Sequence, residues 1–157
     1  MSDIKSKYGS SNQSITITLT SLGSNSAVES NVIDNSSDLF LNVLVAVKVK
    51  TNATSTSSTG YVNVYAYGTA DNGTTYNGGA TGTAGAITLP SVPNVRLIGV
   101  LNTVADATTY VGLFDVASAF GGQMPQKWGI IVDNRSGNTL DGSIGSAWYQ
   151  GIQNQVV

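Results

Sequence analysis

The sequence predicts an all-β domain, built as either a sandwich or a barrel. Apolar and polar residues alternate with a period of two along most of the chain, as in strands that bury one face. About eight or nine such segments are separated by stretches rich in Gly, Ser, Asn and Pro. Charged residues make up only 10% of the chain, and Ser, Thr, Asn and Gly supply the polar surface instead. These residues favour strands and loops over helices.

The first part of the chain contains three expected strands. Residues 14–22, "SITITLTSL", alternate Ile and Leu with Thr and Ser, and residues 27–33 are a weaker candidate. Residues 39–50, "LFLNVLVAVKVK", are apolar on both faces at the start but on one face at the end. This pattern predicts a strand that enters the middle of a sheet and leaves at its rim. One face of it carries Leu39, Leu41, Val43, Val45, Val47 and Val49.

The next strand is expected at residues 60–68, "GYVNVYAYG", after a Ser/Thr-rich loop over 51–59. Together with 39–50 it predicts a long hairpin. Val62, Val64 and Ala66 are expected to face the core. The opposite face then carries Tyr61, Asn63, Tyr65 and Tyr67.

The remaining strands are expected in the second half of the chain, at 86–89, 94–103, 108–116, 127–135 and 146–153. A short helical turn is predicted within "DVASAFGGQ", residues 115–123, because Gly121 and Gly122 stop a helix there. The chain length of 157 residues fits one domain. We expect an extended N-terminal arm over 1–13, followed by the β-domain over 14–157.

The composition excludes several classes of function. The chain has no Cys and no His, so it lacks thiol nucleophiles, imidazole bases, disulfides and the usual zinc ligands. Its net charge is −2 without a cluster of Lys and Arg, which argues against binding nucleic acid. The first residues are polar and no apolar run reaches about 18 residues. We therefore expect synthesis in the cytoplasm and no contact with a membrane.

The carboxylates do not predict catalysis. Glu29 is the single glutamate, and Asp71, Asp106 and Asp141 stand in turn-like contexts where Asp bonds to its own backbone. The segment 71–79, "DNGTTYNGG", superficially resembles a calcium loop but has one acidic residue, whereas an EF-hand needs several. We expect a turn there, and no catalytic residue, metal ligand or cofactor anywhere in the chain.

The aromatic residues leave two interpretations open. Aromatic faces beside Asn and Asp side chains are a common means of binding a sugar ring. Tyr and Trp are also favoured in strands and at protein interfaces for packing reasons alone. Packing within the sheet or between subunits is the favoured interpretation, and glycan contact is the alternative. The residues concerned are Tyr65, Tyr67, Tyr76, Trp128, Trp148 and Tyr149.

Several segments resemble small virion structural proteins of tailed bacteriophages. They are "KYGSSNQSITITLTSL", "GYVNVYAYGTADNGTTY", "NVRLIGVLNT" and "FGGQMPQKWGIIVDNRSGNTLD". The resemblance covers nearly the whole chain. It rests on the overall similarity of these segments rather than on a catalytic motif. It implies a single antiparallel β-sandwich of jelly-roll type. It further implies a non-enzymatic capsid decoration (cement) protein, located on the virion surface, that binds the major capsid protein and forms a homotrimer.

The segment "FGGQMPQKWG", residues 120–129, is a candidate docking end, because Pro125 fixes its backbone and Trp128 is a candidate anchor. An ordinary corner between strands with a core Trp explains the same residues. The alternative function is a carbohydrate-binding β-sandwich module of a virion tail or neck, or of a cell-surface adhesin. The candidate interface residues are Tyr8, Tyr65, Tyr67, Tyr76, Met124, Pro125 and Trp128.

Overall fold

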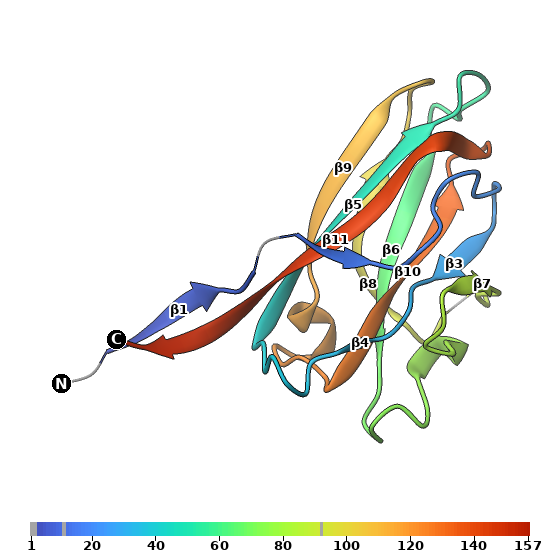
Figure 1. The fold of residues 1–157 in the computed structure, drawn as a ribbon. Coiled ribbons are helices and arrows are strands. Elements are labelled where there is room, and N and C mark those ends of the chain that lie inside the picture. The colour runs from blue at the N-terminus through green and yellow to red at the C-terminus, as the bar shows by residue number, and fades with distance from the viewer. Residues whose placement is uncertain (1–2, 11, 92) are drawn as a thin grey trace.

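Two antiparallel sheets pack face to face in the computed structural model, which describes residues 3–10, 12–91 and 93–157 (Figure 1). Sheet A contains β1 (Ile4–Tyr8), β2 (Gln13–Ile15), β11 (Leu140–Val156), β5 (Asn42–Thr51) and β9 (Thr109–Asp115). Sheet B contains β7 (Gly85–Ile87), β3 (Ala27–Glu29), β4 (Ile33–Asp34), β10 (Lys127–Arg135), β6 (Tyr61–Gly68) and β8 (Arg96–Asn102).

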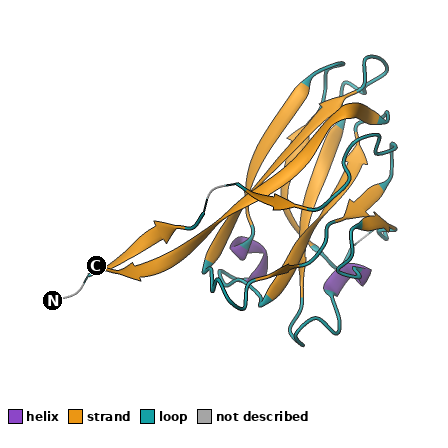
Figure 2. Cartoon of the chain, viewed as in Figure 1, coloured by secondary structure: helices purple, strands orange, loops and turns teal. Residues whose placement is uncertain are grey.

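The strand order is that of a jelly roll. Sheet A runs β2, β11, β5, β9, and sheet B runs β3 with β4, then β10, β6 and β8. Most connections therefore cross from one sheet to the other, as in a double Greek key. The expected all-β jelly-roll sandwich is confirmed. Strands and loops make up nearly all of the described chain, with two short 3₁₀ helices, η1 (Asn77–Gly79) and η2 (Ala117–Phe120) (Figure 2).

The core lies between the sheets and is built largely from the alternating residues of β5, β6 and β10. Val62, Val64 and Ala66 of β6 are fully buried in it, as the period of two predicts. From β5 it takes Val43, Val45, Val47 and Val49, and from β10 it takes Trp128, Ile130 and Val132. One continuous apolar layer thus joins the two sheets.

Two predictions about the segment 39–68 are wrong. Leu39 and Leu41 are exposed, because β5 begins only at Asn42 and Leu39 has a left-handed backbone with φ 52°. The predicted hairpin also does not form. β5 and β6 belong to different sheets, so the 52–60 connection carries the chain across the core instead of pairing the two strands.

The two chain ends pair in a ribbon that projects from the sandwich. β1 runs antiparallel to the end of β11, with Ile4 opposite Val156 and Tyr8 opposite Ile152 (Figure 1). The arm expected over 1–13 includes this strand, and residues 1, 2 and 11 of the arm lie outside the described residues. β11 extends over 140–156, beyond the expected 146–153, because it pairs with β5 and β2 and then with β1.

The connection from β6 to β8 folds back over the outer face of sheet B. This segment, residues 69–95, contains η1 and β7 and forms a second apolar cluster against the sheet. Tyr67 and Ile131 of the sheet and Ala80 and Val95 of the segment are buried there. Along the part of the chain that the structure describes, no helix has the length and apolar character needed to cross a membrane.

Candidate functional site

A groove of about 890 Å³ lies where the segment after β6 meets the η2–β10 connection. Three of the expected interface residues, Tyr76, Met124 and Pro125, line it. The complete lining consists of residues 68–71, 75–77, 96, 119–121 and 123–125. The sequence segment 120–129 thus contributes residues to one wall of the groove.

The first wall is a turn held by Asp71. Its Oδ1 accepts hydrogen bonds from Thr69 Oγ1 at 2.5 Å, from Thr74 N at 3.0 Å and from Thr75 N at 2.9 Å. These bonds, led by that from the Thr69 hydroxyl, hold the pKa of Asp71 well below its usual range. The segment "DNGTTYNGG" therefore begins with the turn that its Asp, Asn and Gly residues predict.

Tyr76 and Asn77 attach this wall to sheet B. The Tyr76 ring packs edge to face on Tyr67, with 5.5 Å between ring centroids. Asn77 accepts a hydrogen bond from Gly68 N at 2.7 Å and donates one to Asn94 O at 3.0 Å. Because both the oxygen and the NH₂ group of its side chain form hydrogen bonds within the chain, Asn77 stabilises this wall.

The second wall is formed by η2 and the turn after it. Gly121 and Gly122 have positive φ values of 75° and 92°, and Gly122 N donates to Ala117 O at 2.9 Å, so the predicted helical turn and its glycine stop are confirmed. Phe120 and Pro125 close over Gly68, where an added Cβ would lie 2.8 Å from the Pro125 ring. The floor of the groove therefore needs a glycine.

Arg96 supplies the cation of the groove, whose lining also includes the Asp71 carboxylate. Its side chain lines the groove and a smaller adjoining hollow. The ion pairs found among the described residues are Lys50–Asp141 and Arg135–Asp133, so the Arg96 guanidinium is not engaged by a carboxylate there. With Tyr76 and Phe120 on either side, the groove combines apolar contact with a cation.

Tyr67 and Trp128 were expected at an interface, and the structure corrects this. Both side chains are fully buried within the chain, so neither lies on a surface that a partner contacts. The Tyr67 hydroxyl donates to Ser30 O at 2.7 Å, and burial raises its pKa. Trp128 packs edge to face on Tyr149, with 5.4 Å between ring centroids. Of the two interpretations of residues 120–129, Trp128 fits the ordinary corner between strands with a core Trp.

The other two expected residues lie away from the groove. Tyr8 is exposed on the ribbon, on the same side as Ile4. Tyr65 is half-buried on the outer face of sheet B, where burial raises its pKa and Asp133 and Arg135 lie nearby. The seven expected residues therefore divide between the groove, the ribbon, the outer sheet face and the core.

Sequence reasoning missed Arg96, Phe120 and Gln123 as groove residues. Phe120 and Gln123 lie in the candidate docking segment 120–129, so their position in the chain could have indicated them. Arg96 carried a weaker signal, as one of two arginines in the chain, at the start of an apolar strand. Its place beside Asp71 and Phe120 depends on how β8 follows the 69–95 segment.

Glu29, the single glutamate, has structural partners. Glu29 is buried and accepts hydrogen bonds from Thr81 N and Thr81 Oγ1, each at 2.8 Å, and from Gly82 N at 3.2 Å. Among the residues that the structure describes, no three His, Cys, Asp or Glu side chains come together as metal ligands do.

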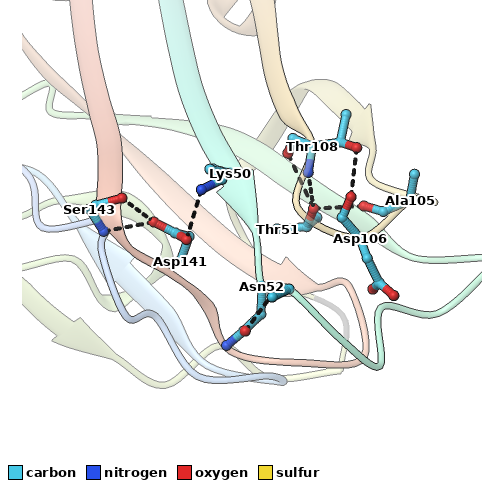
Figure 3. A network of polar contacts seen from close by, with 9 residues as sticks. Lys50, Thr51, Asn52, Ala105, Asp106, Thr108, Asp141 and Ser143 are labelled. Carbon is cyan, nitrogen blue, oxygen red and sulfur yellow. Dashed lines mark hydrogen bonds and ion pairs between the residues drawn. The ribbon is translucent and has the colours of Figure 1, made fainter.

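A second polar network lies around the end of β5, away from the groove (Figure 3). Lys50 Nζ lies 3.1 Å from Asp141 Oδ2, and the Ser143 hydroxyl and amide both donate to Asp141 Oδ1. The Thr51 hydroxyl donates to Ala105 O at 2.6 Å and accepts from Thr108 N at 3.0 Å. These bonds link the end of β5 to the start of β11 and to the connection between β8 and β9.

The comparisons with known proteins add no identity to this geometry. None of the protein-family models matches the chain, and no curated protein sequence matches it either.

Proposed function

We propose that the chain is a non-enzymatic structural protein of a tailed-bacteriophage virion, which binds the major capsid protein and stabilises the shell. It is made in the host cytoplasm and acts on the capsid surface. The proposal rests on the sequence resemblance described above, and the observation that carries it is the β1–β11 ribbon. A protein that clamps shell subunits needs a rigid body and a projecting element that reaches its neighbours.

The ribbon has the character of such an element. Ile4, Tyr8 and Val156 are 70%, 58% and 67% exposed, and they share one side of the ribbon, while Lys5 and Lys7 lie on the other. A two-stranded ribbon is only marginally stable in water, so contact with a neighbour stabilises it. Burying each large apolar side chain contributes about 1.5–3 kcal/mol. Several copies bound across subunits raise the cost of separating them.

Co-sedimentation with shells of the major capsid protein tests this role. The wild-type chain is expected to bind the shells and to raise their melting temperature. The double variant Ile4→Asp, Tyr8→Ser should bind roughly tenfold or more weakly, because it removes apolar contact from an exposed ribbon side. Lys5→Gln, on the other side, is the matched control and should bind nearly as well as wild type. Equal binding by the ribbon variant contradicts the proposal.

The proposal includes self-association into the homotrimer that the resemblance implies. Mass photometry of the purified chain tests it, and a species of three chains is the expected result. A monomer at all accessible concentrations contradicts this part of the proposal without affecting shell binding.

A saccharide-binding role is the second candidate, and the groove favours it. Tyr76 and Phe120 offer aromatic surface beside the Arg96 guanidinium and the Gln123 amide, which is the combination of apolar and polar groups that ligand grooves use. A glycan array probes this role, with Arg96→Ala and Gln123→Ala as variants on exposed side chains. Specific binding that both variants weaken supports it, and no retained glycan excludes it.

A further inference from the structure

The outer faces of the two sheets differ in what covers them. Segment 69–95 covers part of sheet B, where Tyr67 and Ile131 are buried. On sheet A, Val111 and Leu113 point outward from β9 and are 58% and 66% exposed. Large apolar side chains on a sheet face favour contact with another protein surface.

The exposed face of sheet A is organised around a row that crosses three strands. Trp148 of β11 is the Cα partner of Ala46 of β5, and Ala46 is the partner of Leu113 of β9. Directly paired residues point to the same side of a sheet, so the row presents exposed Leu113 and half-buried Trp148, with the small, buried Ala46 between them. We call Trp148, Ala46 and Leu113 the apolar row.

Opposite charges flank the apolar row along the strands. Lys48 lies two residues beyond Ala46 on β5, beside Val111, and Asp115 lies two residues beyond Leu113 on β9, beside Leu44. The period of two places both charged residues on the same face as the row. Neither takes part in the ion pairs formed among the described residues. The face therefore has an apolar centre, a cation toward one end and an anion toward the other.

We propose that this face binds the same face of a second copy of the chain, around a two-fold axis that runs along the apolar row. A two-fold contact uses one patch twice, so the patch must be complementary to itself. Rotation about this axis reverses the strand direction and places the Lys48 end of each copy over the Asp115 end of the other. The charge pattern thus matches its own copy, which is why a second copy is the occupant.

The spacing permits both ion pairs at once. Lys48 and Leu44 are four residues apart on β5, about 13 Å, and the axis brings Lys48 over the Leu44 of the other copy. Asp115 is the Cα partner of Leu44 on the adjacent strand, about 4.8 Å away. A lysine side chain spans that distance. Two symmetric Lys48–Asp115 pairs therefore bracket the apolar centre.

Charge reversal tests the pairing in the full-length chain, by analytical ultracentrifugation between about 1 and 100 µM. Lys48→Glu leaves two acidic groups on the face, and Asp115→Lys leaves two basic ones. Each variant alone should self-associate roughly tenfold or more weakly than wild type, because like charges then meet across the axis. An equimolar mixture of the two variants should associate again, since each acidic face meets a basic one.

Recovery on mixing also shows that both variants are folded. Lys5→Glu, on the ribbon side away from this face, is the matched charge control and should leave association unchanged. Leu113→Asp should abolish it. The contact doubles the number of chains in whatever assembly otherwise forms, from monomer to dimer or from trimer to hexamer. Because this doubling is measured on the purified chain, the test is independent of shell binding. A wild-type chain that does not double, doubling unaffected by Leu113→Asp, or a mixture that stays dissociated overturns the proposal.

Discussion

Tyr67 shows how one side chain constrains the residue across the sheet from it. Its Cα partner on β10 is Gly129, and the Tyr67 ring lies over that glycine. A Cβ at position 129 would overlap the ring, and both residues are buried. The ring has no free space to move into, because Tyr76 packs against it and its hydroxyl is bonded to Ser30.

Gly129→Ala is therefore expected to lower the free energy of unfolding by about 1–3 kcal/mol, the usual cost of overpacking a core. Urea denaturation followed by tryptophan fluorescence measures the change. Gly85→Ala is the matched control. It is exposed on β7 and its added Cβ would meet nothing closer than Thr83 O at 3.9 Å, so its effect should stay within about 0.5 kcal/mol. Equal effects of the two changes would contradict the explanation that overlap with the Tyr67 ring causes the loss of stability.

Asp141 makes stability depend on acid pH. Hydrogen bonds from Ser143, and then the Lys50 ammonium, lower its pKa from 3.8 to about 2. A carboxyl whose pKa is lower in the folded state stabilises the fold above its unfolded pKa, and this contribution is lost as pH falls through the folded value.

Asp141→Asn should consequently have a lower melting temperature than wild type at pH 7, and the difference should vanish between about pH 4 and pH 2. Thermal melts followed by circular dichroism across this range measure it. The pH 7 comparison is the internal control. A difference that persists undiminished at pH 2 shows that the carboxylate charge is not the cause.

Among whole elements, the attachment of segment 69–95 to sheet B depends on Glu29. Its two carboxylate oxygens accept three hydrogen bonds from Thr81 and Gly82, although the glutamate itself is 2% exposed on β3. A second anchor lies nearby, where Asn31 Oδ1 accepts from Ala84 N at 2.7 Å. The segment is thus attached to sheet B by side-chain acceptors as well as by apolar contact.

Glu29→Gln is expected to loosen the segment near Thr81. An amide presents one NH₂ group, which cannot accept the donors that now face both oxygens. Loss of a hydrogen bond to a charged group costs about 1.5–3 kcal/mol, so the Thr81 and Gly82 amides should exchange with solvent roughly ten- to a hundredfold faster. Hydrogen–deuterium exchange by NMR measures this.

Asn31→Ala provides the matched comparison for that experiment. Its effect should centre on the Ala84 amide, because Asn31 accepts its hydrogen bond from that residue. If both variants speed exchange equally along residues 80–84, the anchors are not separate and the segment opens as one unit.

The jelly-roll topology governs the behaviour of the whole molecule. β2 pairs with β11 and β3 pairs with β10, so neighbouring strands come from opposite ends of the chain. One apolar core joins both sheets. Neither sheet can retain its buried face if the other is lost.

Unfolding should therefore be a single cooperative transition, with equal calorimetric and van't Hoff enthalpies. Refolding should take milliseconds to seconds or longer, because distant segments must meet before the core forms. Differential scanning calorimetry and stopped-flow fluorescence make these measurements. Two separate thermal transitions would show that the sheets are stable independently.

The alternation of residue types by itself determined where most strands lie and which side chains can share a face. Strands at 42–51, 61–68 and 109–115 follow that alternation, and the buried Val62, Val64 and Ala66 follow from it directly. β10, at 127–135, is buried on both faces and reads as a continuous apolar run instead. The reason is local, since every second side chain of a strand points to the same side. The end of the helical turn at Gly121 could likewise be predicted from the sequence, because it depends on the backbone freedom of a single glycine.

Only the tertiary structure decided what covers each face. Alternation placed Tyr65 and Tyr67 opposite the core, but the return of residues 69–95 buries Tyr67 and leaves Tyr65 half-exposed. The sheet assignment of β5 and β6 also depends on long-range pairing with β11 and β10, which no local pattern encodes. The groove beside Arg96 and the exposed row on sheet A arise in the same way, because burial is set by which distant segments pack together.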